Sequence, residues 1–191
     1  MHRFDLKCQK TYDSLIRAFE ELMREKTMDT LTVRELCHRA SIGRNTFYSH
    51  FEDKYAFLQY YISLCKESVQ QKTAYRKGDL IRHQAETGLE FFRFMNEHRY
   101  LWERNLSSPS SGLMLEMIKN NIKAPLMDEL ALLEERTGKK SAISKELLAS
   151  FYAAGIIEIF MDHMYCERYT EAEIKMNMYR LCSVLFSPLF S

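Results

Sequence analysis

The chain has 191 residues, of which 46% are hydrophobic and 28% charged, and its formal net charge at pH 7 is +1. This composition excludes a disordered chain, and a net charge so close to zero excludes a protein that binds nucleic acid through overall charge alone. With only 6 Gly and 3 Pro, turn residues are too scarce for an all-β fold, so we expect an all-α protein of about nine helices.

Several classes of protein are disfavoured by what the sequence does not contain. No apolar run approaches the roughly 18 residues of a membrane span, and the N-terminus lacks the apolar stretch of a signal peptide. We therefore expect a cytoplasmic protein with no membrane partner. His163 and Cys166 are spaced to share a metal, but two further ligands are missing, so no metal or cofactor is predicted. Nucleotide-binding and hydrolase motifs are also missing, so we expect no catalytic residue and no enzyme.

The N-terminal region predicts three helices, two of them short. Apolar residues at helical spacing predict a first helix from about Tyr12 to Glu25. Thr32 and Glu35 form a capping box, which predicts the start of a second helix of about eight residues. Gly43 then ends one helix and opens the next, which we expect from Arg44 to Phe51.

Two short helices joined by a four-residue turn have the layout of a helix-turn-helix, whose second helix enters the major groove of DNA. The outward side chains of the second of these helices suit base recognition, since Arg44 can bind guanine, Asn45 adenine and the Thr46 methyl group thymine. From the spacing alone, a merely solvated surface helix and a protein-binding groove remain alternatives.

The stretch from Leu31 to Lys54 resembles the DNA-binding signature of the TetR family of bacterial transcriptional regulators. Its most specific part is Thr-Phe-Tyr-x-His-Phe-x-x-Lys, at residues 46–54. The resemblance covers about residues 11–60 and departs from the family at Ser41, where Gly is frequent, and at Gly43, where Ser is frequent. It implies that base readers and phosphate contacts lie at Thr32, Arg44, Asn45, Thr46, Tyr48, His50 and Lys54.

The rest of the chain also predicts helices. They are expected over residues 54–76, 80–98, 113–136, 144–166 and 170–186, with Pro125 kinking or splitting the third of these and a second capping box at Thr170 and Glu173 opening the last. We therefore predict a DNA-binding domain over residues 1–54 and an effector-binding and dimerisation domain over residues 55–191.

A dimer is expected, because one recognition helix reads only a few base pairs and two must meet the DNA about 34–36 Å, or a multiple of that, apart. The 144–166 helix has an apolar face too wide for a short chain to cover, and the family resemblance implies a four-helix bundle of the last two helices from each chain. The alternative is that these residues form monomer core. The predicted interface residues are Phe151, Gly155, Ile156, Ile159, Phe160, His163, Met178 and Leu181.

Aromatic and Met side chains in the second domain predict a pocket for a flat apolar or aromatic effector. Ordinary core packing is the alternative. The predicted pocket residues are Phe91, Phe92, Met95, Trp102, Met117, Phe151 and Tyr152. The sequence thus favours a homodimeric, ligand-responsive regulator of a palindromic DNA operator, more often a repressor than an activator in this family. The alternative is a regulator whose C-terminal bundle binds a protein co-regulator.

Overall fold

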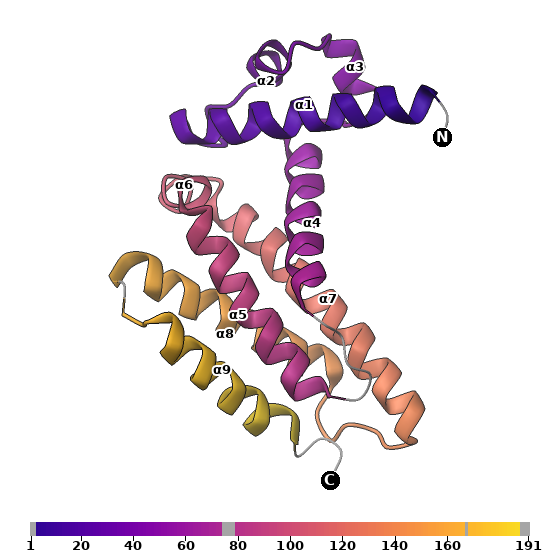
Figure 1. Cartoon of the computed structure of the whole chain (residues 1–191), viewed down its shortest axis with the longest axis vertical. Helices are drawn as coiled ribbons and strands as arrows, with labels where there is room; N and C mark the ends of the chain where they lie inside the picture. The colour runs from indigo at the N-terminus through magenta and orange to yellow at the C-terminus, as the bar shows by residue number, and fades with distance from the viewer. Residues whose placement is uncertain (1–2, 74–78, 167, 188–191) are drawn as a thin grey trace. The chain divides into compact units, whose positions relative to one another are not determined.

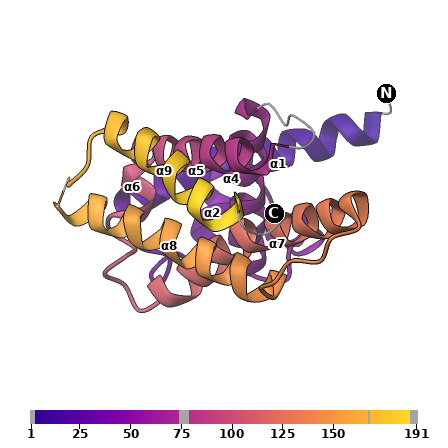
Figure 2. The same cartoon turned by 90° about the horizontal axis from the view of Figure 1, so that it is seen from below.

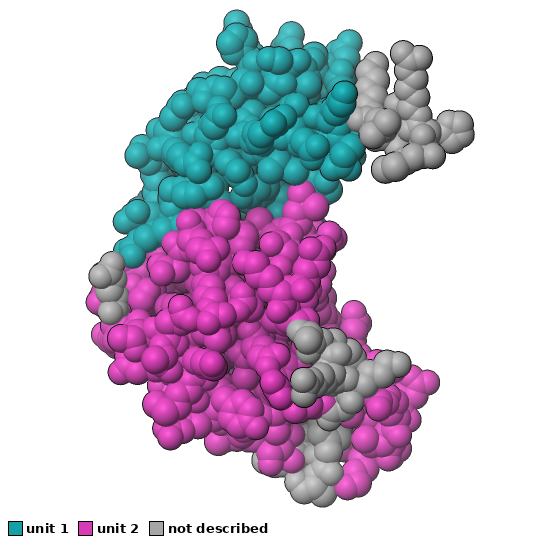
Figure 3. Space-filling view, in the orientation of Figure 1, with its two compact units in different colours: residues 1–62, 99–114 teal, residues 63–98, 115–191 magenta. Residues whose placement is uncertain are grey.

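A computed structural model describes the backbone of residues 3–73, 79–166 and 168–187, and the side chains from residue 8 onward. Within these ranges the chain forms nine helices and no strand, which confirms the all-α prediction. The chain divides into two compact units (Figure 3). Unit 1 comprises residues 1–62 and 99–114, and unit 2 comprises residues 63–98 and 115–191.

Unit 1 contains the three N-terminal helices, the first turns of α4, and α6. The bounds are α1 Arg3–Glu25, α2 Val33–Arg39, α3 Arg44–Tyr48, α4 Lys54–Lys72 and α6 Arg99–Trp102 (Figure 1). Its core is aromatic: the Phe57 ring lies edge-on to Phe19, 5.4 Å between centroids, and 6.3 Å from the ring of Phe47. Because each ring comes from a different helix, these contacts hold α1, α3 and α4 together.

Two helix bounds in unit 1 differ from the predictions. The first helix begins at Arg3, about nine residues before the first periodic apolar position. The third ends at Tyr48 rather than Phe51, since Ser49 caps it and Asp53 starts a new helix by accepting hydrogen bonds of 2.8 Å from the amides of Tyr55 and Ala56. An Asp at this position is a strong helix start. The predicted end of the next helix near residue 76 lies outside the described residues.

Unit 2 consists of four long helices together with the end of α4. Its helices are α5 Leu80–Glu97, most of α7 Ser111–Thr137, α8 Lys145–Cys166 and α9 Glu171–Phe186. Figure 2 shows α5, α8 and α9 running side by side. A Cβ on Gly88 of α5 would lie 2.4 Å from Cε of Met178 on α9. The missing side chain therefore lets α9 pack closely on α5.

The third predicted C-terminal helix is neither split nor ended by its proline. Pro125 lies inside α7, which continues from Ser111 to Thr137. Leu126 and Leu130 of this helix are buried in the core of unit 2. We infer that this packing offsets the backbone hydrogen bond that a proline removes.

Helix α8 is long and apolar enough to cross a membrane by length and composition. A core helix passes the same test, and half of this stretch is buried within the protein. Its buried side chains include Leu148, Tyr152 and Ile156, which join the core that α5, α7 and α9 also form. The buried side of α8 is therefore part of the core of unit 2.

The compact units also show where α4 passes from one core to the other. The predicted domains meet at Lys54, the first residue of α4, whereas compactness divides this helix after Ile62. Phe57 and Tyr61 contact the Phe19 ring of α1 from the first turns of α4. The start of α4 is thus part of the N-terminal core.

Candidate nucleic-acid interface

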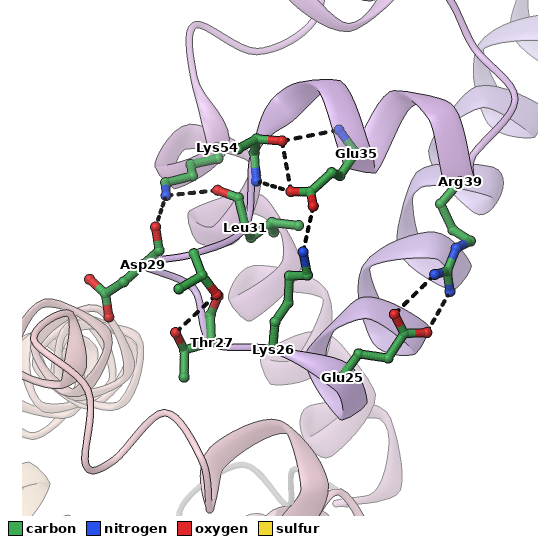
Figure 4. A network of polar contacts seen from close by, with 10 residues as sticks. Glu25, Lys26, Thr27, Asp29, Leu31, Glu35, Arg39 and Lys54 are labelled. Carbon is green, nitrogen blue, oxygen red and sulfur yellow. Dashed lines mark hydrogen bonds and ion pairs between the residues drawn. The ribbon is translucent and has the colours of Figure 1, made fainter.

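The start of α2 is fixed by the predicted capping box. The Thr32 hydroxyl accepts a hydrogen bond from the Glu35 amide at 3.2 Å, and the Thr32 amide donates to the Glu35 carboxylate at 3.0 Å. The Lys26 ammonium binds the same carboxylate (Figure 4). These contacts, the one from Lys26 foremost, lower the pKa of Glu35 to about 2. The carboxylate therefore ties the end of α1 to the first turn of α2.

The turn between α2 and α3 contains both departures from the family pattern. Ser41 has a φ of 56°, in the left-handed region that favours glycine. Gly43 is the N-cap of α3 with extended backbone, and no side chain caps the helix there. The turn thus has glycine geometry at Ser41, while Gly43, the N-cap of α3, has no side chain that could supply a capping hydroxyl.

Helix α3 presents one polar edge. Phe47 is fully buried among the aromatic rings of unit 1, while Arg44, Asn45 and Thr46 are exposed. Among the described residues, the side chains of these three make no hydrogen bond or ion pair. Helix α3 therefore packs on the core through Phe47 and exposes Arg44, Asn45 and Thr46, whose side chains are free to contact a ligand.

Two of the predicted phosphate contacts flank this edge. Tyr48 is 55% exposed, and its hydroxyl has no hydrogen-bond partner in the part of the chain that the structure describes. The half-buried His50 ring lies 5.1 Å from the Tyr12 ring, and its Nδ1 is 3.3 Å from the Tyr12 hydroxyl. The contact with Tyr12 orients the imidazole, whose Nε2 is the atom left to reach a phosphate oxygen.

The other two predicted phosphate contacts are engaged within unit 1. The Thr32 hydroxyl donates its proton to the Glu35 carboxylate at 2.7 Å. The Lys54 ammonium donates to the backbone carbonyls of Met28, Asp29 and Leu31 at 2.8, 3.1 and 2.9 Å. Figure 4 shows the bonds to Asp29 and Leu31. An ammonium has three N–H donors, so a phosphate contact from Lys54 requires that one of these bonds be broken.

Residues 36–51 contain two arginines and no acidic residue, but one of the two arginines is paired within unit 1. The Arg39 guanidinium donates two hydrogen bonds to Glu25, of 2.9 and 3.0 Å (Figure 4). It donates a third hydrogen bond, of 3.2 Å, to Glu21. Both carboxylates belong to α1 and lie 18 and 14 positions from Arg39 in the sequence, so no local pattern indicates the pairing. Arg44 remains the exposed cation at the edge of α3.

The predicted dimer residues divide into two groups. Ile156, Phe160, His163 and Met178 are buried within the chain and have little surface left for a second copy. The physical reason is that α5 covers them: the Phe160 and His163 rings contact Phe91 and Phe92. The residues with exposed or partly exposed surface are Phe151, Gly155, Ile159 and Leu181.

The predicted pocket residues also lie in different places. Phe92, Met95 and Tyr152 are buried in unit 2, and Phe91 and Met117 are partly buried there. Phe151 is 66% exposed, so its side chain does not line the interior of that unit. Trp102 is buried in α6, which belongs to unit 1.

Comparison with known proteins identifies the N-terminal region. Residues 15–61 match the family model described as bacterial regulatory proteins, tetR family. This range includes α2, α3 and most of the residues assigned above to the candidate interface. No curated protein sequence matches this chain.

Solved structures share the fold over nearly the whole chain. A protein of Syntrophomonas wolfei assigned to the TetR family is 14% identical, with a TM-score of 0.69, and the alignment covers 93% of this chain and 95% of that one. Salmonella enterica GusR is 17% identical with a TM-score of 0.62, covering 93% and 95%. The TetR-family repressor AlkX from a Dietzia strain is 15% identical with a TM-score of 0.60, covering 93% and 98%. Residues 15–61 thus carry the helix-turn-helix DNA-binding domain of the tetR family of bacterial regulatory proteins, and the whole chain shares the fold of solved structures assigned to that family.

Proposed function

We propose that this protein is a homodimeric, non-catalytic transcriptional regulator of the cytoplasm that binds a palindromic operator, with an affinity modulated by a small molecule. The observation that carries the proposal is the free polar edge of α3, fixed from behind by the buried Phe47 ring. A rigid anchor with unengaged Arg, Asn and Thr side chains on its outer edge is what base readout in a major groove requires.

In this proposal Arg44, Asn45 and Thr46 read bases, and Tyr48 and His50 contact phosphates. Thr32 is the N-cap of α2, and its hydroxyl already donates its proton to the Glu35 carboxylate. A phosphate contact from Thr32 therefore requires that this bond be broken. For Lys54 the phosphate contact stays a prediction, and we favour a different contribution. By binding three carbonyls of residues 28–31, the Lys54 ammonium holds the loop from which α2 begins.

The dimer is supported by apolar side chains that the chain leaves uncovered on its last two helices. Leu147 and Phe151 of α8 are 65% and 66% exposed, and Gly155 continues the same side of that helix. Leu181 and Val184 are exposed on α9. Exposed apolar rows of this kind mark surfaces that another protein covers, and a second copy would bring two recognition helices to one duplex.

The class of effector is inferred from the interior of unit 2, and the sign of regulation from the family. Unit 2 has an aromatic interior around Phe92 and Tyr152, which favours an apolar or aromatic ligand over a sugar or a nucleotide. Repression is the commoner mode in this family, although the structural neighbours include both the repressor AlkX and DhaS, a dihydroxyacetone kinase operon activator. The alternative is a protein co-regulator bound by the helices of unit 2.

Selection of bound fragments from a random DNA library tests the proposal directly. We expect an enriched palindrome whose half-sites are centred about 34–36 Å apart, one helical turn, or a multiple of this distance. Enrichment of a single half-site would contradict the dimer, and enrichment of no sequence would contradict DNA readout by α3. Repeating the selection with the Arg44→Ala variant shows which position that residue reads.

A further inference from the structure

Residues 99–114 occupy an unusual place in the chain. They follow α5 and lead into α7, whose remaining residues belong to unit 2, yet they are part of unit 1. The segment lies outside residues 15–61, which match the family's DNA-binding region. It contacts the end of α1 and the loop of residues 26–31, from which α2 begins. We call this loop the 26–31 loop.

Asn105 is the centre of these contacts. It is 1% exposed, and its Oδ1 accepts a hydrogen bond of 2.7 Å from the Met28 amide of the 26–31 loop. Its Nδ2 donates to the Leu101 carbonyl at 2.9 Å and lies 3.7 Å from the Met23 sulfur. A buried side chain whose two polar atoms are both engaged fixes the position of its partners, because releasing either atom leaves it unsatisfied.

Ser110 holds the same loop at a second point. Its amide donates to the Asp29 carboxylate at 3.2 Å, and its hydroxyl donates to the other oxygen of that carboxylate. These bonds, the one from the hydroxyl foremost, keep the pKa of Asp29 below its ordinary value. The Asp29 carbonyl in turn accepts from the Lys54 ammonium. Segment 99–114 and α4 therefore both form hydrogen bonds to the 26–31 loop.

We propose that Asn105 and Ser110 are positioning residues for operator binding, which hold the 26–31 loop and through it the start of α2. The inference rests on the proposed function and adds a determinant of DNA affinity that comes from outside the helix-turn-helix. The chain enters this segment from α5 and leaves it through α7, so the segment is joined to unit 2 by helices other than α4.

The Asp29–Ser110 contact allows a test that leaves the buried Asn105 intact. We compare Asp29→Ala, Ser110→Ala and the double variant, with Ser107→Ala as the control because Ser107 is exposed in the same segment. Hydrogen exchange of the Met28 and Leu31 amides is measured on the free protein, and affinity is measured for the operator selected above. Thermal unfolding identifies any variant that loses its fold.

For Asp29→Ala we expect exchange about 3–10-fold faster at these amides and operator binding weaker by a similar factor, within the net range of a typical hydrogen bond. Base preference stays unchanged, and the double variant is no worse than the stronger single one. Additive effects, or faster exchange without weaker operator binding, would overturn this inference alone. If the wild-type protein selects no operator, the proposed function fails, whereas the exchange measurement still reports on the contact.

Discussion

The side-chain amide of Gln84 on α5 donates a hydrogen bond of 2.6 Å to the carboxylate of Glu129 on α7, inside unit 2. The Glu129 side chain is only 12% exposed, and the nearest basic atom, Nε2 of His83, is 4.0 Å away. Burial raises the pKa of Glu129 to about 7, and the bond from Gln84 offsets only part of this effect. Burial also lowers the pKa of His83, so this imidazole is mostly neutral where Glu129 ionises.

Because the pKa of Glu129 is raised in the folded protein, we expect the protein to lose stability as the pH rises. In the unfolded chain Glu129 ionises near its ordinary pKa of 4.5, whereas in the folded protein it stays protonated up to about pH 7. The free energy of unfolding therefore falls between these two values, by about 3 kcal/mol at most. Glu129→Gln removes the ionisation and keeps an acceptor for Gln84. We expect it to be more stable than the wild type at pH 8 and similar at pH 4.

Urea unfolding at pH 4, 6 and 8 checks this expectation. Glu135→Gln is the matched control, since Glu135 is an exposed residue of the same helix. It should leave the pH dependence of the wild type in place. Equal slopes of stability against pH for Glu129→Gln and the wild type would contradict the assignment of Glu129 as a buried, protonated carboxyl group.

A second prediction concerns the turn between α2 and α3. Ser41→Gly should raise the free energy of unfolding by about 1 kcal/mol, because glycine adopts the left-handed conformation without the cost that a Cβ imposes. Ser41→Ala keeps the Cβ and serves as the control, with no gain in stability. If the glycine variant is less stable than the wild type, the Ser41 conformation is not strained.

Helix ends could be predicted from the sequence where a local signal exists. The capping boxes at Thr32–Glu35 and Thr170–Glu173 predicted the starts of α2 and α9, and the structure confirms both. These features depend only on residues within one helical turn, so the sequence contains all that determines them.

Features that depend on distant contacts could not be predicted. Helix α8 is apolar nearly all round, so periodicity did not separate Phe151, which is exposed, from Ile156, which is buried. The Asn105 contact with Met28 joins residues 77 positions apart, and no local pattern around Asn105 indicates it. The sequence shows the charge of Lys54 and the family resemblance, which together predict a phosphate contact. It does not show the three backbone carbonyls that the ammonium binds.

Arg44 provides the most direct test of base readout. Because its side chain is exposed and makes no hydrogen bond within the part of the chain that the structure describes, Arg44→Ala should leave thermal stability unchanged. Operator affinity should fall by about 1–3 kcal/mol, with relaxed preference at one base position. Arg136→Ala, which removes an equal charge from an exposed site at the end of α7, controls for net charge. An Arg44→Ala variant with unchanged base preference would show that Arg44 does not read a base.

Salt dependence distinguishes the two roles considered for Lys54. A phosphate contact contributes about 0.9 to the slope of log affinity against log salt concentration. If the ammonium instead holds the carbonyls of residues 28, 29 and 31, Lys54→Met should lower both thermal stability and operator affinity while the slope stays the same. A slope reduced by about two, since each of the two copies in the dimer would lose one contact, with stability unchanged, would restore the phosphate contact.

The exposed row on α8 leads to a prediction about assembly. Phe151→Glu should produce a monomer, because a two-fold interface contains each substituted residue twice and would bury two carboxylates in place of two aromatic rings. The monomer itself should keep its stability, since the Phe151 side chain is 66% exposed and contributes little to the core. Light scattering gives the mass, and operator binding should lose the half-site that the partner copy reads. Leu132→Glu on α7 is the control, as Leu132 is also an exposed apolar residue. A Phe151→Glu variant that remains dimeric, or a Leu132→Glu variant that dissociates, would move the interface away from α8.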